Sequence, residues 1–179
     1  PSALAASSSA GSIACNGGTT TVTVSASGGT APYSGDGSFT VGAGTHSYTV
    51  TDANGCTSSV SGSISEPSVL TTSSVAGTIT CNGGSTQVTV SGNGGTSPYS
   101  GTGTFTRTAG LYSYTVSDAN GCTSITSGTI PQPAPIAGSG SAAACGTYTW
   151  SANGITYSAS GIYSSVVPAA NGCDSTATL

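Results

Sequence analysis

The feature that most constrains the fold of this chain is a tandem repeat, 1-66 and then 67-132, with two cysteines in each copy. Cys15 and Cys56 of the first copy correspond to Cys81 and Cys122 of the second, with the same spacing and in the same register. About two-thirds of the positions between 11 and 67 are identical in the second copy, which is a strong repeat signal. The chain is therefore built around a duplicated module.

The repeat divides the chain into three expected modules. The first two are 1-66 and 67-132, and 133-179 is a shorter module that is not a copy and that we expect to be truncated. Because the chain starts with Pro1 at a repeat boundary, we expect a mature or excised piece of something longer.

Cysteine usage predicts a disulfide framework. An even number of cysteines, one pair per repeat, indicates an oxidising extracellular setting. A duplicated unit should fold like its copy, so the spacing predicts a bridge inside each module. The expected pairs are Cys15–Cys56, Cys81–Cys122 and, by elimination, Cys145–Cys173. A metal site is the alternative, but the chain has no C-x-x-C pair, and its one histidine, His46, is replaced by Tyr112 in the second copy.

Composition limits the classes of partner. The chain has five acidic residues, and Arg107 is its one basic residue besides His46, for a net charge of −4. A single arginine cannot make the phosphate contacts that nucleic-acid binding requires, so nucleic acid is excluded as a partner. No apolar run is long enough to cross a bilayer, so we expect no membrane span in this segment.

Residue alternation predicts β-strands and argues against helices. Threonine alternates with valine over 19–24 and 86–90, and serine and threonine alternate with tyrosine and valine over 47–50 and 113–116. Such alternation is typical of half-buried strands. The residues expected on the buried faces are Val22, Val24, Tyr48, Val50, Val88, Val90, Tyr114 and Val116. Every asparagine precedes a glycine, and Asn-Gly is a strong hairpin signal because both positions tolerate φ > 0.

Small size and short strands together favour tandem immunoglobulin-like β-sandwiches. A module as short as 1-66 buries a marginal core, so each module should depend on its disulfide. A ring of the expected size stabilises by about 4 kcal/mol in the chain-entropy model. The proline-rich segment 131–135 predicts a stiff connector, and the modules are expected to line up as a rod.

The third segment carries its own β signals. A hairpin is expected between 145–150 and 155–157 with Asn153 and Gly154 at the turn, and a further strand at 161–167 precedes an Asn171-Gly172 turn. Residues 176–179 are predicted to open a strand whose remainder is missing or supplied by a neighbour.

These motifs carry a family resemblance. Cys15-Asn-Gly-Gly18, Gly28-Gly-Thr-Ala-Pro-Tyr33 and Tyr48-Thr-Val-Thr-Asp-Ala-Asn-Gly-Cys56 resemble the SprB-type repeats of large surface and gliding adhesins in Bacteroidota. The second copy matches equally well, so the resemblance covers 1-132. The segment from Cys145 is similar to another short repeat of such secreted proteins. The two copies lack the aromatic-x-Trp that follows the Pro-Tyr in many family members, so their cores must pack differently.

The resemblance implies export by the type IX secretion route, a place on the cell surface, and O-glycosylation. The sequence Asp174-Ser175-Thr176 fits the acceptor pattern that the resemblance implies, with Ser175 as the modified residue. The alternative is that Asp174 closes a turn after the disulfide.

Candidate catalytic residues are few. Asp52 and Asp118 recur before Ala-Asn-Gly, a context typical of turns rather than of calcium or catalytic sites. Asp36 becomes Thr102 in the second copy, and His46 is expected on a strand surface. A glycosidase needs two facing carboxylates and a triad needs a histidine beside a nucleophile, so we expect no enzyme and no cofactor.

Two main hypotheses and a more remote one about function follow. The first is a structural segment of an extracellular fibre or adhesin stalk, with neighbouring repeats as partners, which low charge would help to polymerise into a filament. The second is a module that binds glycans or surface polysaccharide through candidate stacking residues, which otherwise form the small core of the third module. Those residues are Tyr148, Trp150, Tyr157 and Tyr163. A surface that binds ice through its threonines is the third hypothesis, which is disfavoured because ice binding requires a threonine lattice of much shorter period than this repeat.

Overall fold

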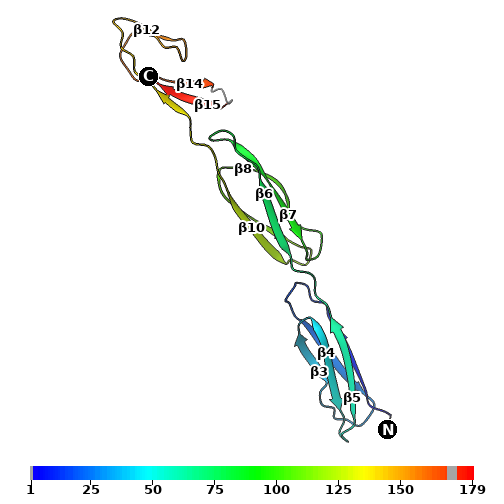
Figure 1. Ribbon diagram of the computed structural model, residues 1–179. Coiled ribbons are helices and arrows are strands. Elements are labelled where there is room, and N and C mark those ends of the chain that lie inside the picture. The colour runs from blue at the N-terminus through cyan, green and yellow to red at the C-terminus, as the bar shows by residue number, and fades with distance from the viewer. Residues whose placement is uncertain (1, 169–172) are drawn as a thin grey trace. The chain divides into compact units, whose positions relative to one another are not determined.

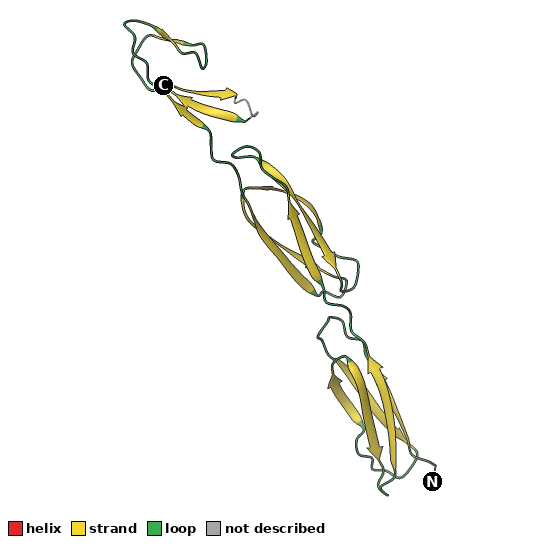
Figure 2. Cartoon of the chain, viewed as in Figure 1, coloured by secondary structure: helices red, strands yellow, loops and turns green. Residues whose placement is uncertain are grey.

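The fold is all-β, as the alternation predicts (Figures 1 and 2). The computed structural model describes residues 2–168 and 173–179, in which all regular elements are β-strands. Within those residues there is no helix that is long and apolar enough to cross a membrane.

The strands gather into two compact units, which are treated separately. The first unit comprises Pro1–Ser73, Ser91–Thr102 and Tyr114–Thr126, and the second comprises Ser74–Val90, Gly103–Ser113 and Ser127–Leu179. The boundary between the units therefore runs through the second repeat. The three-module division expected from the repeat remains a prediction.

The first repeat forms two antiparallel sheets. The larger sheet has the order β1-β2-β3, and the smaller pairs β4 with β5. Their bounds are β1 (Ala5–Ala10), β2 (Thr20–Ser27), β3 (Gly37–Val41), β4 (Gly44–Thr51) and β5 (Thr57–Ile64). The backbone N–H of Ala6 in β1 donates a hydrogen bond to the Ser58 hydroxyl in β5, 3.1 Å away, so the edges of the two sheets are joined.

The core of this repeat lies between the two sheets. Val22 and Val24 from β2 and Val50 from β4 are buried together. Phe39 from β3 stacks on Tyr48 from β4 with ring centroids 4.7 Å apart. Inward valines alternate with outward threonines along β2, which confirms the predicted strand face and gives a β-sandwich.

The second repeat repeats this strand pattern. Its sheets have the orders β6-β7-β8 and β10-β9. Their bounds are β6 (Thr71–Ala76), β7 (Ser85–Asn93), β8 (Gly103–Thr108), β9 (Gly110–Ser117) and β10 (Thr123–Ile130). Val88, Val90 and Val116 are buried, as the alternation predicts.

The described residues of the third segment also form five strands, in a different arrangement. A sheet of order β11-β15-β14 accompanies the hairpin β12-β13, and β11 runs parallel to β15. The bounds are β11 (Ala137–Ser139), β12 (Tyr148–Thr149), β13 (Thr156–Tyr157), β14 (Ser164–Pro168) and β15 (Asp174–Thr178). The predicted hairpin is thus confirmed, and the last strand pairs with strands of its own segment.

Turns in the described residues use glycine alone for left-handed backbone. Gly55 and Gly154 have φ of 81° and 70°, whereas no non-glycine residue among those described has positive φ. The expectation that both residues of an Asn-Gly pair adopt φ > 0 is therefore wrong for Asn54 and Asn153. The Asn171-Gly172 turn lies outside the described residues.

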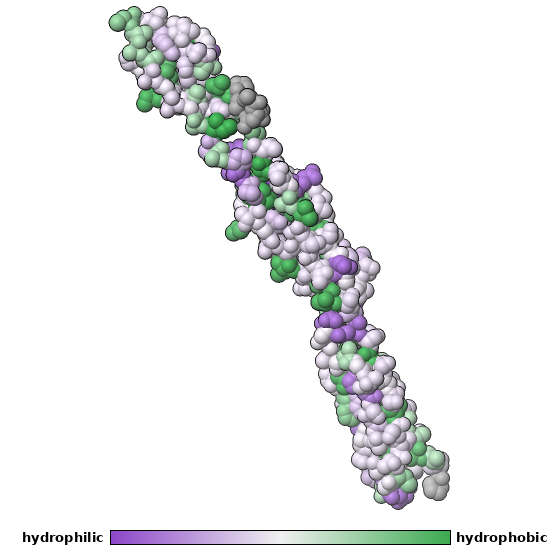
Figure 3. All heavy atoms as spheres, in the orientation of Figure 1, coloured by the Kyte–Doolittle hydropathy of each residue, from purple (hydrophilic) through white to green (hydrophobic). Residues whose placement is uncertain are grey.

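The surface is dominated by residues of intermediate hydropathy. In Figure 3 most spheres are pale, with strongly hydrophilic or hydrophobic residues scattered among them. This pattern agrees with a chain in which charged residues make up 3%. Hydroxyl groups and backbone therefore meet the solvent over most of the visible face.

Candidate functional site

The cysteines lie in two kinds of loop that occupy corresponding places in all three segments. The first cysteine of each segment, Cys15, Cys81 or Cys145, lies between the first and second strands. The second cysteine, Cys56, Cys122 or Cys173, immediately precedes the fifth strand. We call these the first-cysteine loops and the second-cysteine loops.

The first-cysteine loop of repeat 1 is held against the end of its own repeat. Ile13 is buried, and the backbone N–H of Gly18 donates to the Cys15 carbonyl oxygen at 2.9 Å. The side-chain amide of Asn16 donates to the Pro67 carbonyl oxygen at 3.0 Å, and the backbone N–H of Gly17 donates to the Glu66 carboxylate. The loop therefore lies beside the chain that leaves the repeat.

The same contacts recur in the second repeat. The Asn82 amide donates to the Pro133 carbonyl oxygen at 2.9 Å, and the Gly83 N–H donates to the Gln132 side-chain oxygen at 2.9 Å. Ile79 is buried in the place of Ile13. Both copies thus present the first cysteine at the outgoing end of the repeat.

A buried aspartate organises each second-cysteine loop. In repeat 2, Asp118 Oδ1 accepts hydrogen bonds from the backbone N–H groups of Asn120 and Cys122, and Oδ2 accepts one from Thr96, each 2.9 Å long. The Thr96 bond contributes most to holding the pKa of Asp118 below its usual value, against the opposing effect of burial. The carboxylate therefore fixes the loop that carries Cys122.

Repeat 1 builds the same loop around Asp52. Its carboxylate accepts backbone hydrogen bonds from Asn54, Cys56 and Thr30 at 2.9 to 3.0 Å. Burial acts to raise the pKa of Asp52, but these hydrogen bonds outweigh it and hold the pKa below its usual value. The interpretation of both aspartates as turn-formers is confirmed.

A glycine is required opposite each aspartate, because the backbone there approaches the carboxylate closely. Gly95 has φ of 58°, and a Cβ at this position would lie 2.5 Å from Asp118 Oδ2. Gly29 has φ of 59° and stands in the same relation to Asp52, at 2.7 Å. The second glycine of the Gly-Gly-Thr motif therefore leaves room for the aspartate that organises the second-cysteine loop.

Within the first unit, a disulfide joins the two kinds of loop. Cys15 of repeat 1 is bonded to Cys122 of repeat 2, with Cα atoms 5.7 Å apart. Beside the bridge, the Asn120 amide donates to the Ala14 carbonyl oxygen at 2.9 Å. The first cysteine of one repeat thus bonds the second cysteine of the next.

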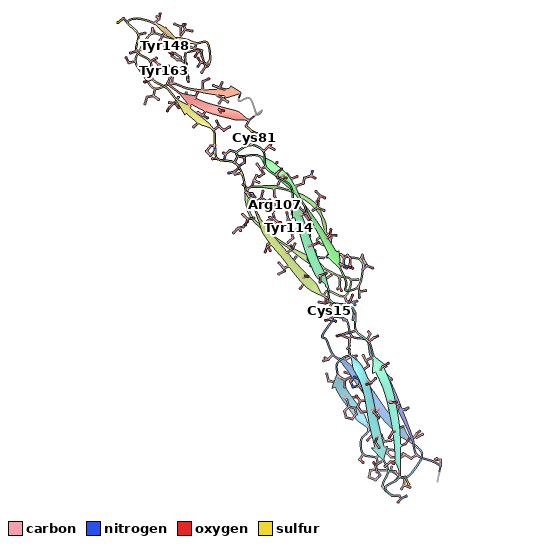
Figure 4. The ribbon with its side chains drawn as sticks, viewed as in Figure 1. Cys15, Cys81, Arg107, Tyr114, Tyr148 and Tyr163 are labelled. Carbon is pink, nitrogen blue, oxygen red and sulfur yellow. A yellow bond between two sulfur atoms is a disulfide. The ribbon has the colours of Figure 1, made fainter. Side chains whose placement is uncertain are left out.

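Within the second unit, the same rule holds. Cys81 of repeat 2 is bonded to Cys173 of the third segment, with Cα atoms 5.4 Å apart. Figure 4 labels Cys15 and Cys81, which both lie in loops outside the strands. The remaining two cysteines, Cys56 and Cys145, are free and exposed.

The predicted pairing inside each module is therefore wrong. The expected bridges were Cys15–Cys56, Cys81–Cys122 and Cys145–Cys173.

The physical reason is the length of β2, which separates the two cysteines of a repeat. Cys15 precedes β2, whereas Thr30, just beyond the other end of β2, contacts the Asp52 loop that carries Cys56. Strand β2 has 8 residues. A strand of that length spans about 26 Å, and a disulfide requires Cα atoms within about 7 Å.

The aromatic residues of the third segment divide into buried and accessible ones. Trp150 is only 7% exposed, so it belongs to the core and offers no open ring face. Tyr157 and Tyr163 are half-buried with ring centroids 3.9 Å apart, and the Asn153 amide donates to the Tyr157 hydroxyl at 2.9 Å. With Tyr148, they line a groove of about 440 Å³ (Figure 4 labels Tyr148 and Tyr163).

The other candidate residues do not form a reactive cluster. His46 is half-buried and its Nε2 lies 2.9 Å from the Gly42 carbonyl oxygen. Ser175 lies in β15 opposite Val167 and is half-buried. Among the described residues, no three His, Cys, Asp or Glu side chains come together in a group able to hold a metal ion.

Sequence reasoning missed the correspondence between the third segment and the repeats. Ala-Asn-Gly-Cys occurs before Thr57, before Thr123 and before Asp174. This shared motif marks Cys173 as a second cysteine and would have made pairing with the first cysteine of the preceding repeat a candidate.

No protein-family model matches the chain, and no curated protein matches it. The two disulfides indicate an oxidising environment outside the cytoplasm.

Proposed function

We propose that the chain is a structural repeat segment of an extracellular fibre or adhesin stalk on the cell surface. The observation that supports this role is the pair of bridges between successive segments. The bridge Cys15–Cys122 overlaps Cys81–Cys173 along the chain, so pulling on the two chain ends loads both bonds. A stalk needs such covalent continuity when a cell pulls on its attachment.

The overlap shortens the covalent path through the chain. From residue 1 the path follows the backbone to Cys15, crosses to Cys122, returns to Cys81 and crosses to Cys173. It contains about 60 residues, which extend to about 220 Å at full stretch. The reduced chain of 179 residues extends to about 630 Å.

Single-molecule force spectroscopy on the chain held at its two ends tests this mechanical role. The oxidised chain should stop extending near the shorter length, and the chain in reductant near the longer length. A variant with Cys56→Ser and Cys145→Ser is the matched control, because it loses two thiols but neither bridge, and it should behave as the parent chain. Equal extension with and without reductant would remove the mechanical support for the proposal.

Location is tested separately. Gold-labelled antibodies against the chain should decorate fibres on intact cells of the producing organism. Label confined to the cell interior would refute the cell-surface role. The resemblance to SprB-type repeats supports export by the type IX route and a setting in Bacteroidota, and a strain of the producer without that route should retain the protein inside the cell.

The contacts of the two recurring aspartates fit a structural role. In the described residues, Asp52 and Asp118 are engaged by backbone N–H groups, which leaves them in a structural rather than a proton-transfer role. We therefore propose no enzymatic activity and no cofactor.

A second candidate function, glycan binding, is favoured by the tyrosine groove of the third segment. Tyr148, Tyr157 and Tyr163 line it together with small residues such as Gly140 and Ser160. Tyrosine rings stack on the apolar faces of sugars while their hydroxyl groups hydrogen-bond.

A glycan array separates this function from the purely structural one. Binding that is lost in Tyr148→Ala but kept in Tyr148→Phe would establish stacking in the groove, since phenylalanine keeps the ring. Trp150→Ala is unsuitable because Trp150 is buried. Absence of any glycan signal from the parent chain would contradict the candidate.

A further inference from the structure

The two free cysteines are one of each kind that the other four cysteines pair in their two bridges. Cys56 is a second cysteine and Cys145 is a first cysteine, and both are exposed. In both observed bridges a first cysteine bonds the second cysteine of the following segment. Within residues 1–179, no first cysteine precedes Cys56 other than Cys15, which is bonded to Cys122, and no second cysteine other than Cys173, which is bonded to Cys81, follows Cys145.

We propose that Cys56 and Cys145 are complementary ends of a covalent head-to-tail joint, in which Cys145 of one copy of this chain bonds Cys56 of the next. The partner is a second copy, because one chain carries both halves of the joint. The proposal gives a partner to the repeat segment proposed above and rests on that role for its biological setting. Its chemistry rests on the disulfide pattern alone.

The loop around Cys56 already has the geometry of the bonded loop around Cys122. Asp52 accepts hydrogen bonds from the backbone N–H groups of Asn54 and Cys56, as Asp118 does from Asn120 and Cys122. The same loop is thus seen once with its disulfide partner and once without.

The amide of Asn54 is ready for the contact that accompanies the bonded state. Asn120 donates both to Thr96 Oγ1 at 3.1 Å and to the Ala14 carbonyl oxygen of the bonded loop at 2.9 Å. Asn54 donates to Thr30 Oγ1 at 3.0 Å, and its amide has no second acceptor among the described residues. Its remaining N–H would reach a carbonyl of the incoming loop.

The acceptor expected on the incoming side is the carbonyl of Ala144. In both observed bridges the residue before the first cysteine, Ala14 or Thr80, directs its carbonyl oxygen at the second cysteine, with sulfur to oxygen distances of 3.4 and 3.3 Å. Ala144 holds this position before Cys145. Alanine in this place is therefore compatible with the joint.

The joint forms by thiol–disulfide exchange with a small-molecule disulfide such as oxidised glutathione. The Cys56 thiolate attacks the oxidant, forms a mixed disulfide and releases one glutathione thiolate. The Cys145 thiolate of the other copy then attacks the Cys56 sulfur and releases the second. The two cysteines lose two protons and two electrons, and the oxidant becomes two molecules of reduced glutathione.

The test mixes two variants of the full chain, Cys56→Ser and Cys145→Ser, in a glutathione buffer and maps the cross-linked peptides by mass spectrometry. If the two exposed thiols react at random, homotypic links (Cys56–Cys56 and Cys145–Cys145 together) and the heterotypic link (Cys56–Cys145) form in equal total amounts. The proposal expects the Cys56–Cys145 link to predominate. It also expects the parent chain to form a ladder of multimers on a non-reducing gel, and each single variant to stop at dimers.

Asn54→Ala in the chain that carries Cys56 provides the specific control. Loss of one hydrogen bond should lower the excess of the heterotypic link about fivefold without affecting the Cys15–Cys122 bridge. A statistical mixture of links, or an excess that Asn54→Ala does not change, overturns the proposal. The extension measured by force spectroscopy on the single chain is independent of this joint, so failure here and failure of the structural role are distinguishable.

Discussion

The bridge between the first two repeats should contribute a large share of the stability of the first unit. The variant Cys15→Ser with Cys122→Ser removes this bridge and keeps the Asp118 loop. The bonded cysteines are 107 residues apart. Closing a ring of that size removes unfolded-chain entropy worth about 5 kcal/mol at 25 °C in the chain-entropy model.

Urea unfolding followed by far-ultraviolet circular dichroism measures the loss. For a unit of this size the free energy of unfolding falls by about 1.5 kcal/mol per molar urea, so the midpoint should move down by about 3 M. Reductant should lower the midpoint of the second unit in this variant, because Cys81–Cys173 lies within that unit and is still present.

The chain supplies a matched control in Cys56→Ser with Cys145→Ser. It replaces the same number of cysteines, one of them in an equivalent loop, but both are free and exposed. Its midpoint should equal that of the parent chain. Equal midpoints for the two double variants, or a larger loss in the control, would refute the assignment of the bridges.

Three further outcomes are expected. Because the pKa of Asp118 is lowered in the folded state, its ionised carboxylate stabilises the fold fully above the unfolded-state pKa, and this stabilisation is lost as the pH falls through the folded-state pKa. The urea midpoint should therefore decrease when the pH is taken below about 4, and it should decrease less steeply in Asp118→Asn. Gly95→Ala should lower the free energy of unfolding by about 2–4 kcal/mol and Gly83→Ala by only about 1–2 kcal/mol, because both glycines have positive φ but only Gly95 faces the Asp118 carboxylate. Equal losses of stability in thermal melts of the two variants would contradict this reasoning. Ser175 should carry an O-glycan in protein from the native source, and an unmodified mass for peptide 173–179 would dismiss it.

The strands were predictable because their signal is local. Valines two residues apart share one strand face, and Val22, Val24 and Val50 are indeed buried in one core. The aspartate turns were predictable for the same reason, since Asp52 bonds backbone groups within four residues of itself.

The disulfide pairing was not predictable from the cysteine spacing. Two identical copies give the same spacing whether a bridge closes inside a repeat or between successive repeats. The difference lies in tertiary structure, because Cys15 and Cys56 are held at opposite ends of β2. The aromatic candidates divide between the two alternatives: Trp150 is buried, as the core alternative expects, whereas Tyr148, two residues before it, lines a groove, because β12 ends at Thr149.

Overlapping bridges protect the connectors in a way that bridges inside modules cannot. With the expected pairing, one cut near Pro67 or in the exposed segment 131–135 would release the downstream part of the chain. With Cys15–Cys122 and Cys81–Cys173, a single cut anywhere from 15 to 173 leaves the two pieces joined by at least one bond. Proteases cut preferentially at exposed connectors. The pairing therefore places covalent strength where a repeat array with small cores is weakest, which is between its modules rather than within them.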